Sequence, residues 1–165
     1  METIIFDRTN ELRKNLKELE RKLNVKISAT GRKVTISGDA LDEYEAMIIL
    51  DAMSRGFSAS KALMLKEEGM SFRVLSIKDF TRKKNLKEVR ARIIGRQGRT
   101  RKTMEDISGA EIVVHDNDVG IIAHSENMDE IVKSITALVR GTKQANTYRH
   151  LERINKMKKK RLSNL

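Results

Sequence analysis

Two glycines three residues apart, Gly95 and Gly98, lie in the most basic stretch of the sequence. Because glycine has no side chain, a pair at this spacing allows a tight turn and lets a sugar-phosphate backbone approach the main chain. A helix that begins near Gly98 would direct its free amides and the positive end of its dipole at the same place. Further positive charge comes from Arg96, Arg99, Arg101 and Lys102. These residue types at this spacing predict contact with the phosphates of a polyanion.

The positive charge of the chain is concentrated around these glycines. The protein has 34 Lys and Arg against 23 Asp and Glu, a net charge of +11. Residues 1–68 are neutral overall, so residues 69–165 carry the whole excess. Residues 82–102 include ten basic residues and a single acidic one, Glu88. This distribution favours a polyanionic partner for the second part of the chain. A second basic cluster at residues 156–161 is explained equally well by a solvated helix end.

The segments around the glycines follow a regular order of strands and helices. Apolar patterns and turn residues predict a strand at 71–78, a helix at 85–93, the glycine loop, a second helix, a hairpin of 111–115 and 119–123, and a last helix. The last helix carries apolar residues at helical spacing: Met128, Ile131, Val132, Ile135, Leu138 and Val139. A Gly-x-x-Gly alone is usually an ordinary turn. In this βααββα order it is the pattern of a type I KH domain, whose loop clamps backbone nucleotides.

A KH groove has an apolar floor beside the loop, on which the bases lie. By analogy we expect this floor at Ile93, Ile94, Ile112 and Val114, although each could equally be an ordinary core residue. Aromatic residues are 4% of the chain and Trp is absent, which suits a groove that does not rely on aromatic stacking. The predicted RNA-contacting residues are therefore Arg92, Ile93, Ile94, Gly95, Arg96, Gln97, Gly98, Arg99, Arg101, Lys102, Ile112 and Val114.

The sequence also resembles itself at an offset of 85 residues. Ile27 aligns with Ile112, and Arg55-Gly56 aligns with Arg140-Gly141. Each copy predicts a hairpin followed by a helix that ends at Gly56 or Gly141, and Ser58 and Thr142 are expected to cap the next helices. The first-copy helix is expected to face a sheet with the stripe Leu41, Tyr44, Met47, Ile48 and Ala52.

The first copy lacks the glycine loop. At the same offset Gly95 and Gly98 fall on Asn10 and Arg13, and we interpret the first helix and the loop as deleted. The predicted fold is α+β, with two tandem type I KH-like modules. Residues 1–68 form the degenerate one, and residues 69–165 form the KH domain with a basic C-terminal helix or tail. A neutral module without the loop is expected to give structural support or to contact protein.

The chain resembles the archaeal tandem-KH assembly factor of the small ribosomal subunit, a relative of the eukaryotic partner-of-Nob protein, most closely in its second copy. The resemblance covers residues 31–155 and is strongest at 92–101, 119–122 and 138–153, with Arg55 to Leu63 in the first copy. It implies a non-enzymatic factor that binds single-stranded RNA at the 3′ region of small-subunit rRNA. The implied protein partners are the endonuclease that trims this end and the alpha subunit of translation initiation factor two. The family's proline after each Arg-Gly pair is absent here.

The sequence gives little support for catalysis, so we expect no enzyme, no metal and no cofactor. His115, His124 and His150 lack a metal-ligand spacing. Asp116 and Asp118 resemble paired carboxylates but fall in a predicted turn, where Asp is common. No Cys is present, and no apolar run approaches the length of a membrane helix, so we expect a cytoplasmic protein without a membrane partner.

Three functions are compatible with these patterns. The first is an assembly factor of the small ribosomal subunit that acts in maturation of the rRNA 3′ end. The second is a KH protein of another RNA pathway, such as transcription antitermination or RNA decay. The third is a protein-interaction scaffold that does not bind RNA, which the intact loop and its basic flanks argue against.

Overall fold

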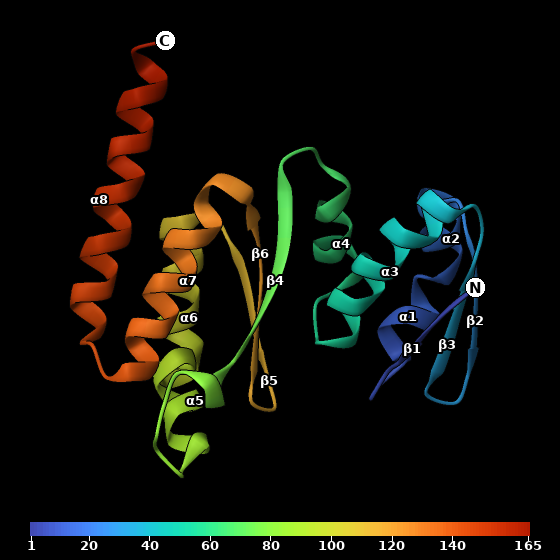
Figure 1. Cartoon of the computed structure of the whole chain (residues 1–165), viewed down its shortest axis with the longest axis horizontal. Coiled ribbons are helices and arrows are strands. Elements are labelled where there is room, and N and C mark those ends of the chain that lie inside the picture. Colours follow the sequence, from blue (N-terminus) through green and yellow to red (C-terminus); the bar gives the residue numbers. More distant parts are fainter. The chain divides into compact units, whose positions relative to one another are not determined.

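The computed structural model describes residues 1–165 and divides into two compact units, Met1–Phe72 and Arg73–Leu165. Each unit, called unit 1 and unit 2 below, combines a three-stranded sheet with helices (Figure 1). This architecture agrees with the predicted α+β class. None of the helices is both long enough and apolar enough to cross a membrane.

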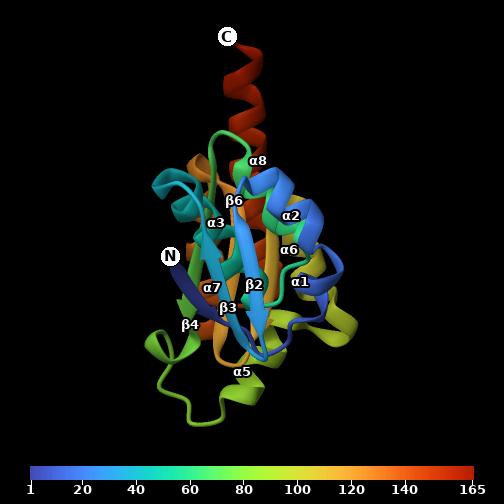
Figure 2. The ribbon, with the colours of Figure 1, turned by 90° about the vertical axis from the view of Figure 1, so that its right-hand side faces the viewer.

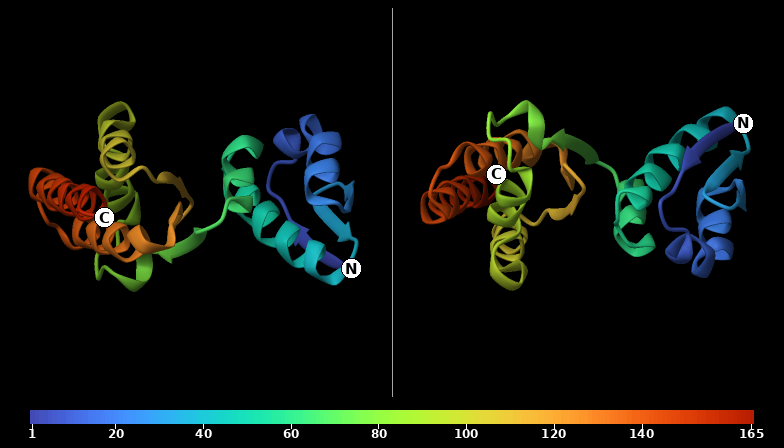
Figure 3. Two further views of the ribbon diagram at one scale, coloured as in Figure 1. Left: turned by 90° about the horizontal axis from the view of Figure 1, so that it is seen from above. Right: turned by 90° about the horizontal axis from the view of Figure 1, so that it is seen from below.

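Unit 2 contains the glycine loop between its first two helices. Its elements are β4 (Met70–Ser76), α5 (Leu86–Ile94), α6 (Arg99–Ser108), β5 (Glu111–His115), β6 (Asp118–His124), α7 (Ser125–Arg140) and α8 (Gln144–Ser163). The boundary between the units falls within β4. The sheet has the order β4-β6-β5, and the helices lie together on one side of it (Figures 1 and 3). The order from β4 to α7 is the predicted βααββα.

The predicted hairpin forms between β5 and β6. His115 pairs with Asp118, so the connecting turn has two residues, Asp116 and Asn117. Asp116 has a φ of 52°, a left-handed conformation that Asp tolerates better than most residues. Asp116 therefore lies in the turn, as predicted, and Asp118 is the first residue of β6.

The core of unit 2 lies between the helices and the sheet. Five of the six residues of the α7 stripe predicted from the sequence are buried, with Ile135 and Leu138 at 1% and 0% exposure, and Val132 is partly buried. The stripe meets Ile121 of β6 and Met104 of α6 in one apolar cluster, and α8 contributes Leu151. Burial of these side chains, each worth about 1.5–3 kcal/mol, holds α5 and α6 at the angle that forms the loop.

Unit 1 repeats the element order on a smaller scale. Its elements are β1 (Glu2–Ile5), α1 (Asn10–Lys14), α2 (Leu16–Leu23), β2 (Lys26–Thr30), β3 (Lys33–Ser37), α3 (Ala40–Ser54) and α4 (Ala59–Ala62). The sheet order β1-β3-β2 again places the third strand in the middle (Figure 2). The expected deletion of the first helix is wrong, since a five-residue α1 remains and only Asn15 separates it from α2. As predicted, there is no glycine loop between these helices.

The predicted apolar stripe of α3 is wrong in its first part, although Ala52 is buried as predicted and Met47 and Ile48 are half-buried. Leu41 and Tyr44 are 77% and 67% exposed, whereas Ala46, Ile49 and Leu50 are fully buried. The reason is that α3 has apolar residues around most of its circumference, so that periodicity does not identify the inward face. Unit 1 consequently exposes apolar side chains near the start of α3.

Both long helices that precede an Arg-Gly pair end in the same backbone motif. Gly56 and Gly141 have φ of 115° and 108°, as expected for glycines that terminate helices. In α7, Gly141 N–H donates to the carbonyl of Leu138 and Thr142 N–H to that of Ala137. The N-cap prediction holds for Ser58, whose hydroxyl accepts from Lys61 N–H at 3.3 Å. It is wrong for Thr142, because the Thr142 amide bonds back to α7 and Lys143 is the residue that directly precedes α8.

A carboxylate fastens a helix to the next strand in each unit. Glu20 of α2 accepts from Ile27 N–H and Glu105 of α6 accepts from Ile112 N–H, both at 2.9 Å. These two pairs are separated by the same 85 residues as the sequence repeat. Burial raises the pKa of Glu105, against the lowering effect of the Ile112 amide and of the Arg101 guanidinium.

We expect Glu105→Ala to destabilise unit 2 because it leaves the Ile112 amide without an acceptor. The expected loss is about 1–3 kcal/mol of unfolding free energy, measured by urea denaturation. Asp106→Ala is the matched control on the same helix, since Asp106 is exposed and a surface change costs about 0.5 kcal/mol or less. Equal losses of unfolding free energy for the two variants would contradict the conclusion that Glu105 holds α6 to β5.

Candidate nucleic-acid interface

The glycine loop is a compact turn with several left-handed residues. α5 ends at Ile94, Gly95 follows with φ 76° and ψ 174°, and a single 3₁₀ turn of Arg96–Gly98 leads into α6. Gln97 and Gly98 have φ of 53° and 74°. The two helices are thus joined by a turn whose main chain is not covered by a regular element.

Gly95 and Gly98 serve different purposes in this turn. A Cβ at Gly95 would lie 2.1 Å from the hydroxyl oxygen of Thr100 and 2.7 Å from its backbone nitrogen, so only glycine fits. A Cβ at Gly98 would meet nothing closer than Arg101, at 3.8 Å. Gly95 is therefore required by packing, whereas Gly98 leaves the main chain open to a ligand.

The loop is supported from behind by the start of α8. Thr100 is 3% exposed, and its hydroxyl accepts from the side-chain amide of Gln144 at 2.9 Å. Arg92 of α5 donates to the carbonyl of Thr142 at 2.9 Å. No sequence pattern indicated the pairing of Thr100 with Gln144, because they are 44 residues apart and meet only in the folded unit.

The outer side of the loop is strongly positive. Arg96, Gln97, Arg99 and Lys102 are exposed, and none of them forms an ion pair. No acidic residue occupies the first turn of α6 and no side chain caps it. The unpaired cations and the positive end of the helix dipole therefore act on the same place, as an anion site requires.

An open groove runs beside the loop between α5 and the β5–β6 hairpin. Its volume is about 350 Å³, and it is lined by Lys87, Arg90, Ala91, Ile94, Val114 and Asp116. Arg90 donates to the main-chain carbonyl of Asp116 at 2.9 Å and so connects the two walls. The groove combines an apolar surface suited to base faces with the exposed cation of Lys87, which suits a phosphate.

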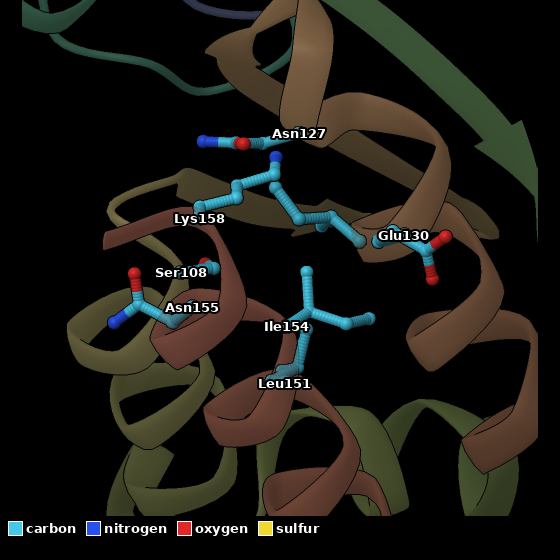
Figure 4. Close-up of a pocket in the computed structure, with 8 residues that line it drawn as sticks. Ser108, Asn127, Glu130, Leu151, Ile154, Asn155 and Lys158 are labelled. Carbon is cyan, nitrogen blue, oxygen red and sulfur yellow. The ribbon is translucent and has the colours of Figure 1, made fainter. Parts of the chain in front are cut away.

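A second, much smaller pocket lies where α6, α7 and α8 meet (Figure 4). Its volume of about 20 Å³ is enough for about one water molecule. The side-chain oxygen of Asn127 is buried there without a hydrogen-bond partner, and Lys158 donates to the carbonyl of Glu126 at 3.0 Å. This pocket belongs to the packing of α8 and is too small for a nucleotide.

The second unit matches a known family. Residues 71–156 match the family model of the second KH domain of PNO1, described as a eukaryotic-type KH domain (KH domain type I). The chain belongs to this type I KH-domain family. The glycine loop and the neighbouring groove of unit 2 are therefore a KH loop and a KH groove.

The relatives extend this similarity over most of the chain. A KH domain-containing protein of Methanocaldococcus jannaschii is 34% identical over 83% of this chain, and the pre-rRNA-processing protein pno1 of Emericella nidulans is 26% identical over 87%. The chain spans only 63% and 58% of the lengths of these two proteins. A chain in the crystal structure of the a/eIF2alpha–aDim2p–rRNA complex from Pyrococcus horikoshii is 33% identical, with a TM-score of 0.84 over 94% of this chain and 93% of that one.

The structure separates the predicted contact residues of the KH domain into three groups. Those at the open face of the loop or in the groove are Ile94, Arg96, Gln97, Gly98, Arg99, Lys102 and Val114, and Gly95 lies in the loop but packs against Thr100. Arg92 and Arg101 are engaged internally, Arg101 with Glu105 at 2.9 Å and with the carbonyl of Ile112 at 3.2 Å.

The third group corrects the predicted groove floor. Ile93 and Ile112 are 0% and 1% exposed, so they lie in the core beneath the groove and cannot touch a base. Sequence reasoning missed Lys87, Arg90, Ala91 and Asp116, which line the groove instead. Lys87, Arg90 and Ala91 could have been found from their helical spacing to Ile94 on α5.

We expect Gly95→Ala to destabilise the KH domain more than another positive-φ glycine would. Gly109→Ala is the control, since Gly109 has φ 74° but open space at its Cβ position, and should cost about 1–2 kcal/mol of unfolding free energy. Gly95→Ala adds the clash with Thr100 and should cost at least twice as much by urea denaturation. Equal losses would mean that Thr100 can move away from the loop.

Proposed function

We propose that this chain binds single-stranded RNA through the KH loop and groove of unit 2 and acts in assembly of the small ribosomal subunit. The observation that carries the RNA-binding part is the uncovered main chain at Gly98, which is flanked by the unpaired cations Arg96, Arg99 and Lys102. The adjoining groove supplies an apolar surface at Ile94 for the bases. A KH site of this kind holds a short unpaired segment rather than a duplex.

The ribosomal part of the proposal is supported by the relatives. One is a pre-rRNA-processing protein, and a solved structure of similar fold contains aDim2p with rRNA and a/eIF2alpha. By this likeness the RNA is the 3′ region of small-subunit rRNA, and the protein partners are the initiation factor alpha subunit and the endonuclease that matures this end. The function is binding without catalysis, and it belongs in the cytoplasm.

We further propose that unit 1 is a degenerate KH-like module that contacts protein. It shares with unit 2 the sheet order and the carboxylate link from helix to strand, but its helices α1 and α2 are joined only by Asn15. The exposed side chains Leu41 and Tyr44 give it an apolar surface that RNA phosphates would not use. The initiation factor alpha subunit is the partner that we assign to this surface.

Gly98→Asp should abolish RNA binding because it places a carboxylate where a phosphate would lie. Gly98→Asn is the matched control, since Asn has the same shape, tolerates the left-handed conformation and carries no charge. Fluorescence anisotropy with a labelled single-stranded RNA should show a loss of at least tenfold for Asp relative to Asn, with similar thermal unfolding of both. If both variants bind alike, the loop is not the site.

Binding should also weaken with salt. For single-stranded RNA the logarithm of the association constant should fall with a slope of about −0.7 per phosphate contacted. An affinity that does not depend on salt would favour the scaffold function. Sequencing of RNA crosslinked to the protein in cells would separate a ribosomal function, which requires small-subunit rRNA 3′ ends, from another RNA pathway.

The double change Leu41→Ser and Tyr44→Ser should weaken binding of the initiation factor alpha subunit without changing RNA affinity. Both side chains are exposed, so the fold should keep its unfolding temperature. Isothermal titration with the purified alpha subunit would measure the effect. Unchanged binding would show that this face of α3 does not contact the alpha subunit.

A further inference from the structure

Helix α8 carries a line of cations along its exposed face. Arg149, Arg153, Lys156 and Lys160 follow one another at intervals of four, three and four residues, which places them on one side of a helix. All four are exposed, and none of their side chains forms an ion pair or a hydrogen bond. The opposite side of α8 is the packed one, with Thr147 and Leu151 buried. We call these four residues the α8 stripe.

The distal half of α8 packs only along its inner side, where Ile154, Asn155 and Lys158 line the small pocket. Beyond Leu151 no residue of the helix is buried, and the ribbon continues past the ends of α6 and α7 (Figures 1 and 2). Residues 152–165 contain six basic residues and the single acidic residue Glu152. Like charges three and four residues apart destabilise a helix, so this segment would gain from an anionic partner.

The α8 stripe is connected to the KH loop through the contacts between α8 and α6. Gln144 at the start of α8 binds Thr100 at the start of α6. Further along, Lys158 of α8 lies with Ser108 of α6 in the lining of one pocket (Figure 4). The two helices therefore run in the same direction away from the loop. With a rise of 1.5 Å per residue, the stripe extends for about 16 Å.

We propose that the α8 stripe is a second, sequence-independent contact for the RNA strand whose neighbouring nucleotides are held at the KH loop. This inference rests on the proposed function of unit 2. Its partner is the sugar-phosphate backbone, because the stripe offers about one long, flexible cation per helical turn on the exposed face of a helix. The matched KH family model ends at residue 156, so the last cation of the stripe lies beyond the domain itself.

The test compares two single-stranded RNAs, a 15-mer from the 3′ end of small-subunit rRNA and the 5-mer within it that binds wild-type protein most tightly. The stripe variant carries Arg149→Gln, Arg153→Gln, Lys156→Gln and Lys160→Gln, changes that preserve helix propensity. The control variant removes the same charge from exposed positions of unit 1, with Lys14→Gln, Lys17→Gln, Arg21→Gln and Lys26→Gln.

Wild type should bind the 15-mer at least tenfold more tightly than the 5-mer. The stripe variant should lose this advantage while it binds the 5-mer normally, and its salt slope on the 15-mer should be smaller by about 2.8, which is 0.7 for each of four phosphates. The control variant should retain the advantage.

Other outcomes would distinguish failure of the proposed function from failure of the inference about α8. If wild type binds neither RNA, the proposed function itself fails. If wild type binds the 5-mer but the stripe variant and wild type show the same affinity and salt slope on the 15-mer, the inference about α8 is overturned and the KH site stands. The same result together with weaker binding of the stripe variant to a protein partner would assign α8 to that partner instead.

Discussion

The close approach of Gly95 to Thr100 is the contact on which the candidate RNA site depends. Thr100 is buried, and Gln144 fixes its hydroxyl from the other side, so the main chain at residue 95 has no room for a side chain. This arrangement brings the end of α5 directly against the start of α6. It also exposes the turn between them, because the space on the inner side is already occupied. The loop is therefore open on its outer side because Thr100 and Gln144 fill the space behind it.

Net charge alone does not identify the cations that are free to bind a ligand. Arg92, Arg101 and Arg90 each donate to a main-chain carbonyl of unit 2 and so hold the framework together. Arg96 and Lys102, in contrast, have no partner within the protein. A buried or fully engaged guanidinium would lose those bonds on turning to a phosphate, whereas an exposed one loses only water. Fewer cations near the loop are therefore free to bind a ligand than the sequence alone suggests.

Sequence patterns predicted those parts of the molecule that local chemistry determines. The hairpin, the α7 stripe and the glycines that end helices depend on neighbouring residues, and they are confirmed. The inward face of α3 depends on which of several apolar sides meets the sheet, and this prediction was wrong for Leu41 and Tyr44. For Ile93 and Ile94, adjacent positions of one helix, only the folded structure separates a core residue from a groove residue.

The two units show how a framework and a site can be separated. Glu20 and Glu105 make the same bond to the next strand, and Asn24 and Gly109 end their helices in the same left-handed conformation. These shared contacts hold helix to sheet, and they do not involve the loop. Unit 1 keeps them with Asn15 in place of a glycine turn. Since unit 1 keeps these contacts without a glycine turn, they do not require the open main chain at Gly98 or the unpaired arginines beside it, and a ligand best explains both.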